Sequence, residues 1–453
     1  MKYFLMHLGC QMNQSDAERI RTVLEGMGME RTEREEDADI LGMVACSVRQ
    51  KAIDRVYSRI HKWNTWKRSR NIVTFVSGCI LPADREKFLD RFDLVFSITE
   101  LPELPRMITE YGILTPASAS RVIPPSSLVD SRRGYWHVEP SYSAGTEAFI
   151  PIQNGCDKFC TFCAVPYTRG REVSRPHHEI LEEFDRVLER GYRAITLLGQ
   201  NVNSYGRDVH ADGVDFAGLL RGVGQRAARS GRRVWVYFTS PHPRDMTREV
   251  LEVIARYPQI ARQIHLPIQS GDDTILEHMN RRHTLDDYRR IVSDIREIVP
   301  EATLFTDIIV GFPGETEEQF ERTRAAMREF RYNMAYVAMY SPRPGARSAR
   351  LPDDVPHEEK KRRLHVLSEE LKEIVSQYNG SLVGRRLPVL VTGRDRKPGY
   401  LSGMTEGRLV VRIASSDTSL VGEMIDVEIT DHASLSLSGE PATAVAAAQG
   451  AGT

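Results

Sequence analysis

The chain has 453 residues, of which 41% are hydrophobic and 27% charged, and its formal net charge is -1. This composition excludes a fibrous or disordered protein, the length predicts two to four domains, and the near-neutral charge restricts any nucleic-acid surface to a local patch. We find neither an apolar run long enough to cross a membrane nor a secretory signal at the start. We therefore expect a cytoplasmic protein with no membrane partner.

The first segment, residues 1–117, alternates apolar strand-like runs with amphipathic helical patterns. The runs cover residues 2–9, 38–45, 71–78 and 92–98. That alternation predicts an N-terminal parallel α/β domain. Residues 118–143 carry Pro, Ser and Gly without apolar periodicity and are predicted to be a linker.

The next segment, residues 144–374, contains six strand candidates separated mostly by amphipathic helices. The candidates are residues 148–153, 193–200, 234–240, 263–269, 303–311 and 335–341. Six β/α repeats are fewer than the eight of a closed barrel, so we predict a partial, open (β/α)6 barrel. Working residues are expected at the C-terminal strand ends, where the loops converge.

The last part of the chain changes character again. Residues 377–440 contain short strands without intervening helices, which predicts a small β-barrel. Residues 441–453 are low in complexity and are predicted to form a disordered tail. The fold class is therefore α/β, with an N-terminal parallel α/β domain, a central partial barrel and a small C-terminal β-barrel.

Three cysteines, Cys156, Cys160 and Cys163, are spaced as CxxxCxxC directly after the first barrel strand. Three thiolates suit three irons of a 4Fe-4S cluster and leave the fourth iron open for S-adenosylmethionine (SAM). A structural zinc site is the alternative, but it needs four ligands and no second cysteine pair follows. The spacing therefore favours the cluster.

This motif at the start of a partial barrel resembles the radical SAM superfamily. Five further segments are similar to the methylthiotransferase family, and the resemblance covers nearly the whole chain: residues 162–176, 197–206, 265–271, 311–316 and 340–346. The C-terminal module resembles the TRAM domain of RNA-modifying enzymes. The resemblance implies a radical SAM methylthiotransferase that uses SAM.

A second set of cysteines, Cys10, Cys46 and Cys79, lies far apart in the sequence. Each follows an apolar run, and strand ends of an open parallel sheet line one crevice, so the three thiols can converge. A single cysteine so placed is more often structural, but three equivalent placements favour a shared ligand. The resemblance implies a second, auxiliary 4Fe-4S cluster here. The family usually has other residues at Val44-Ala45 and Ile80-Leu81-Pro82, so we expect altered surroundings for that cluster.

Cofactor contacts are expected from strand ends of the barrel. Gly199 permits close approach, and the amides of Gln200 and Asn201 suit the amino acid end of SAM. Strand alternation predicts that His265 and Gln269 line the pocket. The remaining predicted cofactor contacts are Phe162, Gly311 and Gly314, although the turn containing the two glycines is equally consistent with a simple strand-to-helix connection.

RNA contacts are predicted in two places. Arg169, Arg171 and Arg175 follow the cysteine loop and suit RNA phosphate. Residues 380–413 carry seven arginines or lysines against two acidic residues, which indicates either a solvated face or an RNA-binding surface. We favour RNA, with five predicted contacts there: Arg385, Arg386, Arg394, Arg396 and Lys397.

Residues 9–13 with Ser15-Asp16 are similar to the branch of the family that acts on isopentenylated adenosine in tRNA. The resemblance implies that one SAM methylates sulfur at the auxiliary cluster and that a radical then abstracts hydrogen from C2 of N6-isopentenyladenosine at tRNA position 37. No catalytic side chain beyond the cluster ligands is expected, because this C–H bond offers no acidic proton. The implied partners are the tRNA anticodon stem-loop, an electron donor such as flavodoxin or ferredoxin, and a sulfur donor.

Two alternatives remain open at this point. One is a methylthiotransferase acting on N6-threonylcarbamoyladenosine in tRNA or on an aspartate of a ribosomal protein. The other is a non-catalytic RNA-binding protein whose cysteines hold structural zinc.

Overall fold

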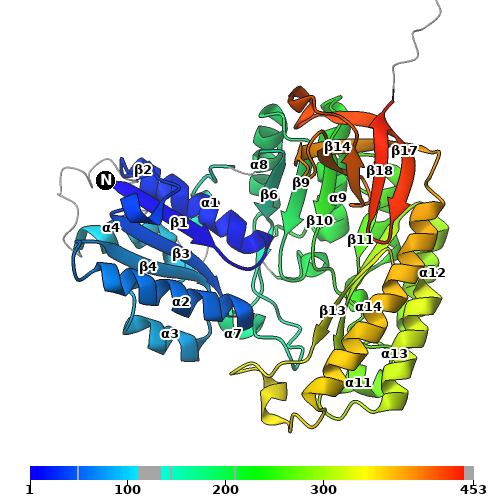
Figure 1. The fold of residues 1–453 in the computed structure, drawn as a ribbon, viewed down its shortest axis with the longest axis horizontal. Helices are drawn as coiled ribbons and strands as arrows, with labels where there is room; N and C mark the ends of the chain where they lie inside the picture. Colours follow the sequence, from blue (N-terminus) through cyan, green and yellow to red (C-terminus); the bar gives the residue numbers. More distant parts are fainter. Residues whose placement is uncertain (48–49, 111–133, 143–144, 209–210, 443–453) are drawn as a thin grey trace, which may run out of the picture.

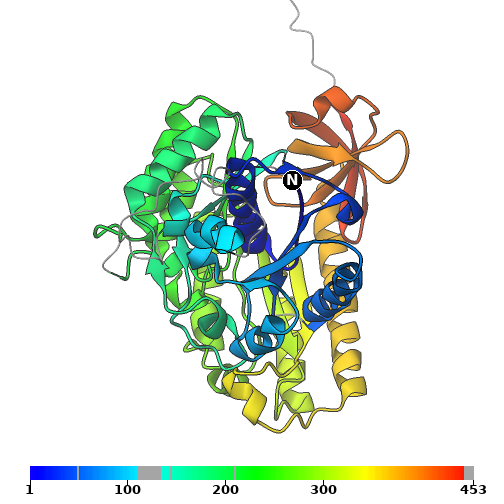
Figure 2. The same ribbon diagram turned by 90° about the vertical axis from the view of Figure 1, so that its left-hand side faces the viewer.

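The computed structural model describes residues 1–47, 50–110, 134–142, 145–208 and 211–442. In Figure 1 the N-terminal domain, in blue, lies beside the green and yellow barrel, and the C-terminal β-barrel, in orange and red, lies at the top of that barrel. Figure 2 shows the N-terminal domain in front of the barrel, facing the viewer. None of the helices in these ranges is long and apolar enough to cross a membrane.

The N-terminal domain is a parallel sheet with strand order β2-β1-β3-β4-β5. β3 is buried along its whole length, as expected of a strand covered by helices on both faces. The predicted strands are confirmed, while β2 was missed because it has only two exposed residues. The elements are β1 (Lys2–His7), α1 (Gln11–Gly26), β2 (Glu30–Arg31), β3 (Ile40–Cys46), α2 (Gln50–Trp66), β4 (Val73–Cys79), α3 (Pro82–Leu89), β5 (Leu94–Val95) and α4 (Leu104–Glu110).

The predicted linker contributes to this domain's core. Residues 118–133 lie outside the described residues, but the short helix η3 (Tyr135–His137) packs against the sheet. Tyr135, Trp136 and Val138 are buried in the same cluster as Tyr3 and Leu101. Three apolar residues are too few to produce a periodic pattern, which is why the sequence did not reveal this packing.

The central barrel has six parallel strands, as predicted. They form two three-stranded sheets, β6-β9-β10 and β11-β12-β13, and an isolated parallel bridge joins Val236 of β10 to Ile260. The strands are β6 (Glu147–Pro151), β9 (Ala194–Leu198), β10 (Trp235–Phe238), β11 (Gln263–His265), β12 (Thr303–Val310) and β13 (Met334–Met339). The main helices are α8 (His177–Glu189), α9 (Phe216–Arg229), α10 (Arg248–Arg256), α11 (Asp273–His278), α12 (Leu285–Ile298), α13 (Glu317–Phe330) and α14 (His357–Gly380).

The C-terminal module is a closed β-barrel of order β14-β15-β16-β18-β17, as the fold class predicted. Its strands are β14 (Arg386–Arg394), β15 (Leu401–Thr405), β16 (Val410–Ile413), β17 (Met424–Ala433) and β18 (Ser436–Pro441). The sequence missed β15 and β18 because LSGMT and SLSGEP contain few apolar residues. The predicted tail starts too early, because Pro441 ends β18 and the Ala442 amide donates to the Asp426 carbonyl. Residues 443–453 lie outside the described residues.

The C-terminal barrel is anchored on the central barrel by polar contacts. The Arg408 guanidinium donates to Glu147 Oε1 at 2.5 Å and lies over the Tyr237 ring, 4.0 Å from its centroid. The Arg262 amide donates to Glu406 Oε1 at 2.9 Å. These contacts bring Arg408 to the interior of the central barrel.

Candidate functional site

The loop of Cys156, Cys160 and Cys163 follows β6 and is held by close backbone packing. Gly155 has φ +82°, and a Cβ there would overlap the carbonyl oxygen of Arg171. The Gly155 amide donates to Gln200 Oε1 at 2.5 Å, and the Cys156 amide donates to the Gly170 carbonyl at 3.2 Å. The loop is therefore fixed between the end of β9 and residues 170–171.

The sulfurs of this loop lie in a partly buried setting. The Arg281 guanidinium donates to Cys160 Sγ and the Val165 amide to Cys163 Sγ, both at 3.5 Å. Burial raises the pKa of the Cys156 and Cys163 thiols to about 12. Their thiolates therefore need the positive charge of bound metal, which is the usual condition for cysteine ligands.

The number of sulfur ligands on this loop favours a cluster over a single zinc ion. Its three cysteines suit three irons of a 4Fe-4S cluster and leave the fourth iron open, whereas a structural zinc takes four protein ligands.

The barrel interior next to this loop contains buried polar atoms that fit SAM. Asn201 Oδ1, Gln269 Oε1, Gln153 Oε1 and the Nε2 atoms of His242 and His283 have no hydrogen-bond partner among the described residues. Buried polar atoms without a partner are rare and costly, so they indicate a polar ligand. Asn201 is oriented by its amide, which donates to Asp245 Oδ2 at 3.2 Å. The predicted contacts Asn201 and Gln269 thus each offer a buried oxygen with no partner among the described residues.

The other predicted cofactor contacts have different surroundings. Gly199 and Gln200 line a cavity beside the barrel loop, and Phe162 packs against Met279, Phe312 and Tyr340. Gly311 and Gly314 lie in the strand-to-helix turn, and their contacts account for glycine at both positions. A Cβ on Gly311 would overlap Lys360 of α14, and the Gly314 amide donates to Asp354 at 2.8 Å.

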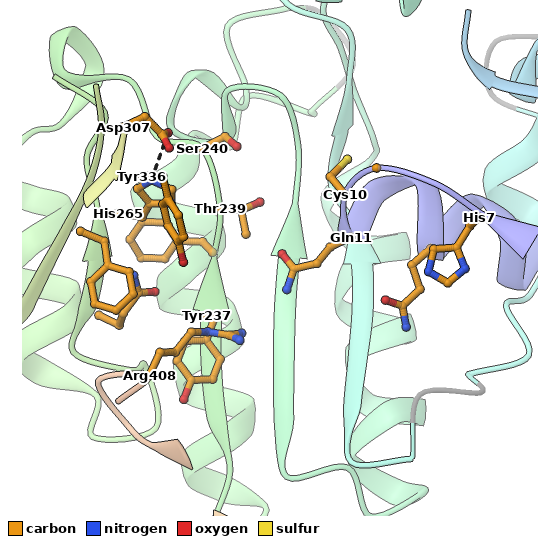
Figure 3. Close-up of a pocket in the computed structure, with 15 residues that line it drawn as sticks. His7, Cys10, Gln11, Tyr237, Thr239, Ser240, His265, Asp307, Tyr336 and Arg408 are labelled. Carbon is orange, nitrogen blue, oxygen red and sulfur yellow. Dashed lines mark ion pairs between the residues drawn. The ribbon is translucent and has the colours of Figure 1, made fainter. Parts of the chain in front are cut away.

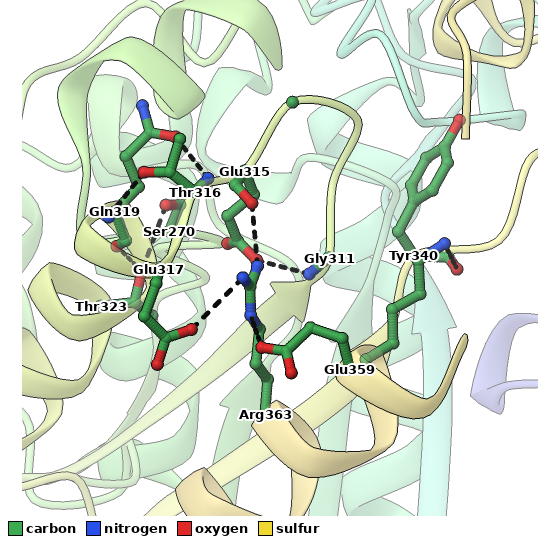
Figure 4. A network of polar contacts seen from close by, with 12 residues as sticks. Ser270, Gly311, Glu315, Thr316, Glu317, Gln319, Thr323, Tyr340, Glu359 and Arg363 are labelled. Atoms are coloured by element: carbon green, nitrogen blue, oxygen red, sulfur yellow. Dashed lines mark hydrogen bonds and ion pairs between the residues drawn. The ribbon is translucent and has the colours of Figure 1, made fainter. Parts of the chain in front are cut away.

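Figure 4 shows what holds that turn in place. The Glu315 carboxylate accepts from the Gly311 amide at 2.6 Å and from the Arg363 guanidinium at 2.8 Å. Both side chains are buried, 0% and 5% exposed respectively, and Arg363 also pairs with Glu359. The ion pair of Glu315 with Arg363 fixes the turn against α14, while the other carboxylate oxygen, Oε1, is buried with no hydrogen-bond partner among the described residues.

The second cysteine triad converges, although its members are far apart in the sequence. Cys46 and Cys79 end neighbouring strands as register partners, and Cys10 precedes α1. All three line one cavity of about 230 Å³, together with Arg169, Gly199 and Gln200 from the barrel. Gly9 has φ +113°, and a Cβ there would lie 2.8 Å from Cys46 Cβ and 3.2 Å from Cys46 Sγ, which leaves little room for a side chain. The cavity therefore opens toward the barrel site.

The residues that depart from the family pattern, Val44-Ala45 and Ile80-Leu81-Pro82, directly precede Cys46 or follow Cys79. Val44 and Ala45 are buried in β3, and the Ala45 carbonyl accepts from the Asn13 side chain at 2.7 Å. Leu81 is 1% exposed and its amide donates to Ser47 Oγ, while Pro82 begins α3. These residues support the strand ends by packing and backbone hydrogen bonds.

A larger cavity of about 630 Å³ adjoins the first, because both are lined by Gly9, Cys10 and Gln11. Figure 3 shows that its opposite wall comes from the barrel strands and from Arg408. There His265 pairs with Asp307 at 3.1 Å, and the His265 and Tyr336 ring centroids lie 5.7 Å apart. Tyr336 is 53% exposed. His265, predicted to line a pocket, lines this cavity, whereas Gln269 does not. Tyr237, Asp307 and Tyr336 were not predicted, although strand alternation alone could have suggested them.

Two of the predicted RNA contacts are wrong. Arg175 is 3% exposed and pairs with Glu179 and Glu183, and the Arg169 side chain is 2% exposed and pairs with Asp16. Buried and paired guanidiniums are not available to a phosphate. Arg171 is exposed but pairs with Asp157. The predicted contacts on the C-terminal barrel are exposed: Arg385, Arg386, Arg394, Arg396 and Lys397.

The open barrel and its three-cysteine loop define a radical SAM enzyme. The radical SAM superfamily matches residues 150–327, the uncharacterized protein family UPF0004 matches residues 2–99 and the TRAM domain matches residues 380–442. The tRNA-2-methylthio-N(6)-dimethylallyladenosine synthase of Neisseria gonorrhoeae is 37% identical over 97% of this chain and 99% of its own. The synthase of that name from Actinobacillus pleuropneumoniae is 38% identical over 95% of this chain and 90% of its own.

The chain therefore belongs to the family of tRNA-2-methylthio-N(6)-dimethylallyladenosine synthases. It is a radical SAM methylthiotransferase, a class that uses a 4Fe-4S cluster and SAM. Among solved structures, the radical SAM methyltransferase TsrM from Kitasatospora setae covers 90% of this chain and 80% of its own with a TM-score of 0.55. At 15% identity that likeness concerns the fold alone.

Proposed function

We propose that the enzyme inserts a methylthio group at C2 of N6-isopentenyladenosine at tRNA position 37. The observation that carries the proposal is the pair of adjoining cavities, which share Cys10 and are walled by residues of the N-terminal domain, the central barrel and, through Arg408, the C-terminal barrel. The names of the relatives supply the substrate class.

We propose a second 4Fe-4S cluster on Cys10, Cys46 and Cys79. Its support is the convergence of the three thiols on one cavity whose lining, among the described residues, offers no fourth cysteine, histidine or carboxylate to complete a zinc site. Three ligands leave one iron open for the sulfur that is transferred. Cys10 is exposed and lies on both cavities, so sulfur held beside it faces the larger one.

The larger cavity suits a nucleoside that has been turned out of the RNA loop. Its volume lies within the usual range for small-molecule sites, about 300 to 1,000 Å³. Tyr336 and His265 offer rings for base stacking, and Asp307 and Gln263 offer polar groups for the base edge. We propose that this cavity holds the target adenosine.

The bound cofactors supply the chemistry for a C–H bond that is not acidic: SAM provides a methyl group and, on reductive cleavage, a 5'-deoxyadenosyl radical. The chain's own residues orient the reactants and exclude water. Asn201 and Gln269 hold SAM, and the cavity walls fix the purine beside Cys10. No side chain needs to remove a proton.

Three partners complete the proposal. The exposed basic residues of the C-terminal barrel bind the phosphates of the anticodon stem-loop. Reductive cleavage of SAM requires an electron from outside the chain, which we assign to a donor such as flavodoxin or ferredoxin. A separate sulfur donor renews the transferred sulfur.

Mass spectrometry of tRNA nucleosides from a deletion strain tests the proposed substrate. We expect 2-methylthio-N6-isopentenyladenosine to disappear, N6-isopentenyladenosine to accumulate, and the wild-type gene to reverse both changes. Unchanged levels would refute this substrate. Loss of methylthio from threonylcarbamoyladenosine or from a ribosomal-protein aspartate would instead assign the enzyme to that substrate.

A further inference from the structure

Arg169 is a buried cation at the junction of the two cysteine sites. It follows Cys163 by six residues in the barrel loop, yet its side chain reaches into the N-terminal domain. Its Nε donates to Cys79 Sγ at 3.0 Å, and a terminal nitrogen donates to Asn154 Oδ1 at 3.2 Å. The other terminal nitrogen donates to Asp16 Oδ2 at 2.6 Å and to Asn13 Oδ1 at 3.0 Å.

Asn13 extends these contacts to the other two strand ends. It is fully buried, and its amide donates to the carbonyls of Leu8 and Ala45, both at 2.7 Å. Leu8 lies two residues before Cys10, and Ala45 directly precedes Cys46. Arg169 and Asn13 therefore connect the supports of all three N-terminal cysteines.

The charges explain why this arginine is not a simple stabilising contact. Burial opposes its charge, but Asp16 and Cys79 hold the pKa of Arg169 well above its usual value. A buried ion pair generally contributes little net stability, because desolvation offsets the attraction. The ion pair of Arg169 with Asp16 is better explained by its holding a fixed positive charge against the Cys79 sulfur.

We propose that Arg169 is a positioning residue that raises the reduction potential of the cluster on Cys10, Cys46 and Cys79 and ties that site to the barrel loop. This inference depends on the second cluster proposed above. Hydrogen bonds to cluster sulfurs and nearby positive charge stabilise the more negative, reduced state. The planar fork of arginine is required, because a lysine cannot make the contacts to Cys79, Asn154 and Asp16 together.

Arg171 provides a matched control two residues along the same loop. It carries the same charge, but its side chain is 71% exposed and pairs with Asp157 at the surface. Arg171→Gln removes a guanidinium whose hydrogen bonds go to Asp157 rather than to Cys79. A difference between the two positions therefore reports on contact with Cys79 rather than on net charge.

The experiment uses the full chain with Cys156, Cys160 and Cys163 replaced by alanine, so that any cluster signal comes from the N-terminal site. Iron content and the midpoint potential are measured anaerobically by redox titration followed by electron paramagnetic resonance, with and without Arg169→Gln, Arg169→Lys or Arg171→Gln. For Arg169→Gln we expect the reduced state to be disfavoured about tenfold, which is ~59 mV for a one-electron couple. Arg169→Lys should fall in between, and Arg171→Gln should match the parent.

The outcomes separate this inference from the proposed function. A parent that binds no iron contradicts the second cluster itself. A parent with about four irons whose potential is unchanged in Arg169→Gln overturns the role of Arg169 alone. If Arg169→Gln fails to hold iron, Arg169→Lys decides: a lowered potential supports the inference, and a potential equal to that of the parent overturns it.

Discussion

The two cysteine triads differ in how the chain builds them. Cys156, Cys160 and Cys163 lie within eight residues on one loop after β6, whereas Cys10, Cys46 and Cys79 come from three strand ends, thirty-six and thirty-three residues apart. The loop is shaped by local backbone, such as Gly155, while the second site depends on the register of a whole sheet and on Arg169 from another domain. The first site follows from spacing within one loop, whereas the second follows only once its cysteines are placed at the strand ends of a parallel sheet.

The largest loss of activity is expected when a cysteine of the barrel loop is replaced. Cys160→Ala removes one ligand of the cluster that cleaves SAM, so we expect 5'-deoxyadenosine formation to fall to the level of enzyme without a cluster. High-performance liquid chromatography of anaerobic reactions with a chemical reductant measures this. Product formation at the wild-type rate in Cys160→Ala would break the assignment of the loop.

Replacing a cysteine of the second triad should abolish one product and leave the other. Cys79→Ala leaves the barrel loop intact, so we expect methylthiolated tRNA to disappear while 5'-deoxyadenosine is still formed. Both products are measured in the same reaction, which makes the barrel activity an internal control. Equal loss of both products would contradict separate roles for the two triads.

The larger cavity predicts a moderate effect on substrate binding. Tyr336→Ala removes a stacking surface worth about 1–3 kcal/mol per base, so we expect a roughly 10- to 100-fold rise in KM for tRNA. Tyr336→Phe keeps the ring and should change KM less than threefold. Reductive cleavage of SAM without tRNA should be unaffected in both variants. Similar KM values for alanine and wild type would place the target base elsewhere.

Alanine substitutions at two glycines of the barrel loop should differ in how much stability they cost, and this effect is smaller. Gly155 and Gly170 both have positive φ, but a Cβ on Gly155 overlaps the Arg171 carbonyl while a Cβ on Gly170 meets nothing within 4 Å. We expect Gly170→Ala to cost about 1 kcal/mol in stability and Gly155→Ala ~3 kcal/mol or more, with loss of barrel-site iron. Thermal unfolding and iron analysis compare them. Equal costs would mean that the loop backbone is not held as tightly as its geometry indicates.

The sequence revealed the fold because its strong signals are local. Six apolar runs predicted the six barrel strands, and the CxxxCxxC spacing identified the loop. The sequence was misleading where the role of a side chain depends on the residues that pack around it in the fold. Arg169 and Arg175 resemble RNA contacts in sequence, but Asp16, Glu179 and Glu183 bury them as ion pairs. Arg408 gave no signal as a cavity residue, since three domains assemble that cavity.

Iron and acid-labile sulfide analysis of the anaerobically reconstituted wild-type enzyme, beside Cys46→Ala and Cys160→Ala, tests the central claim of two incompletely ligated clusters most directly. The account predicts about eight irons in the wild type and about four in each variant. Four irons in the wild type, or zinc in place of iron at either triad, would contradict it.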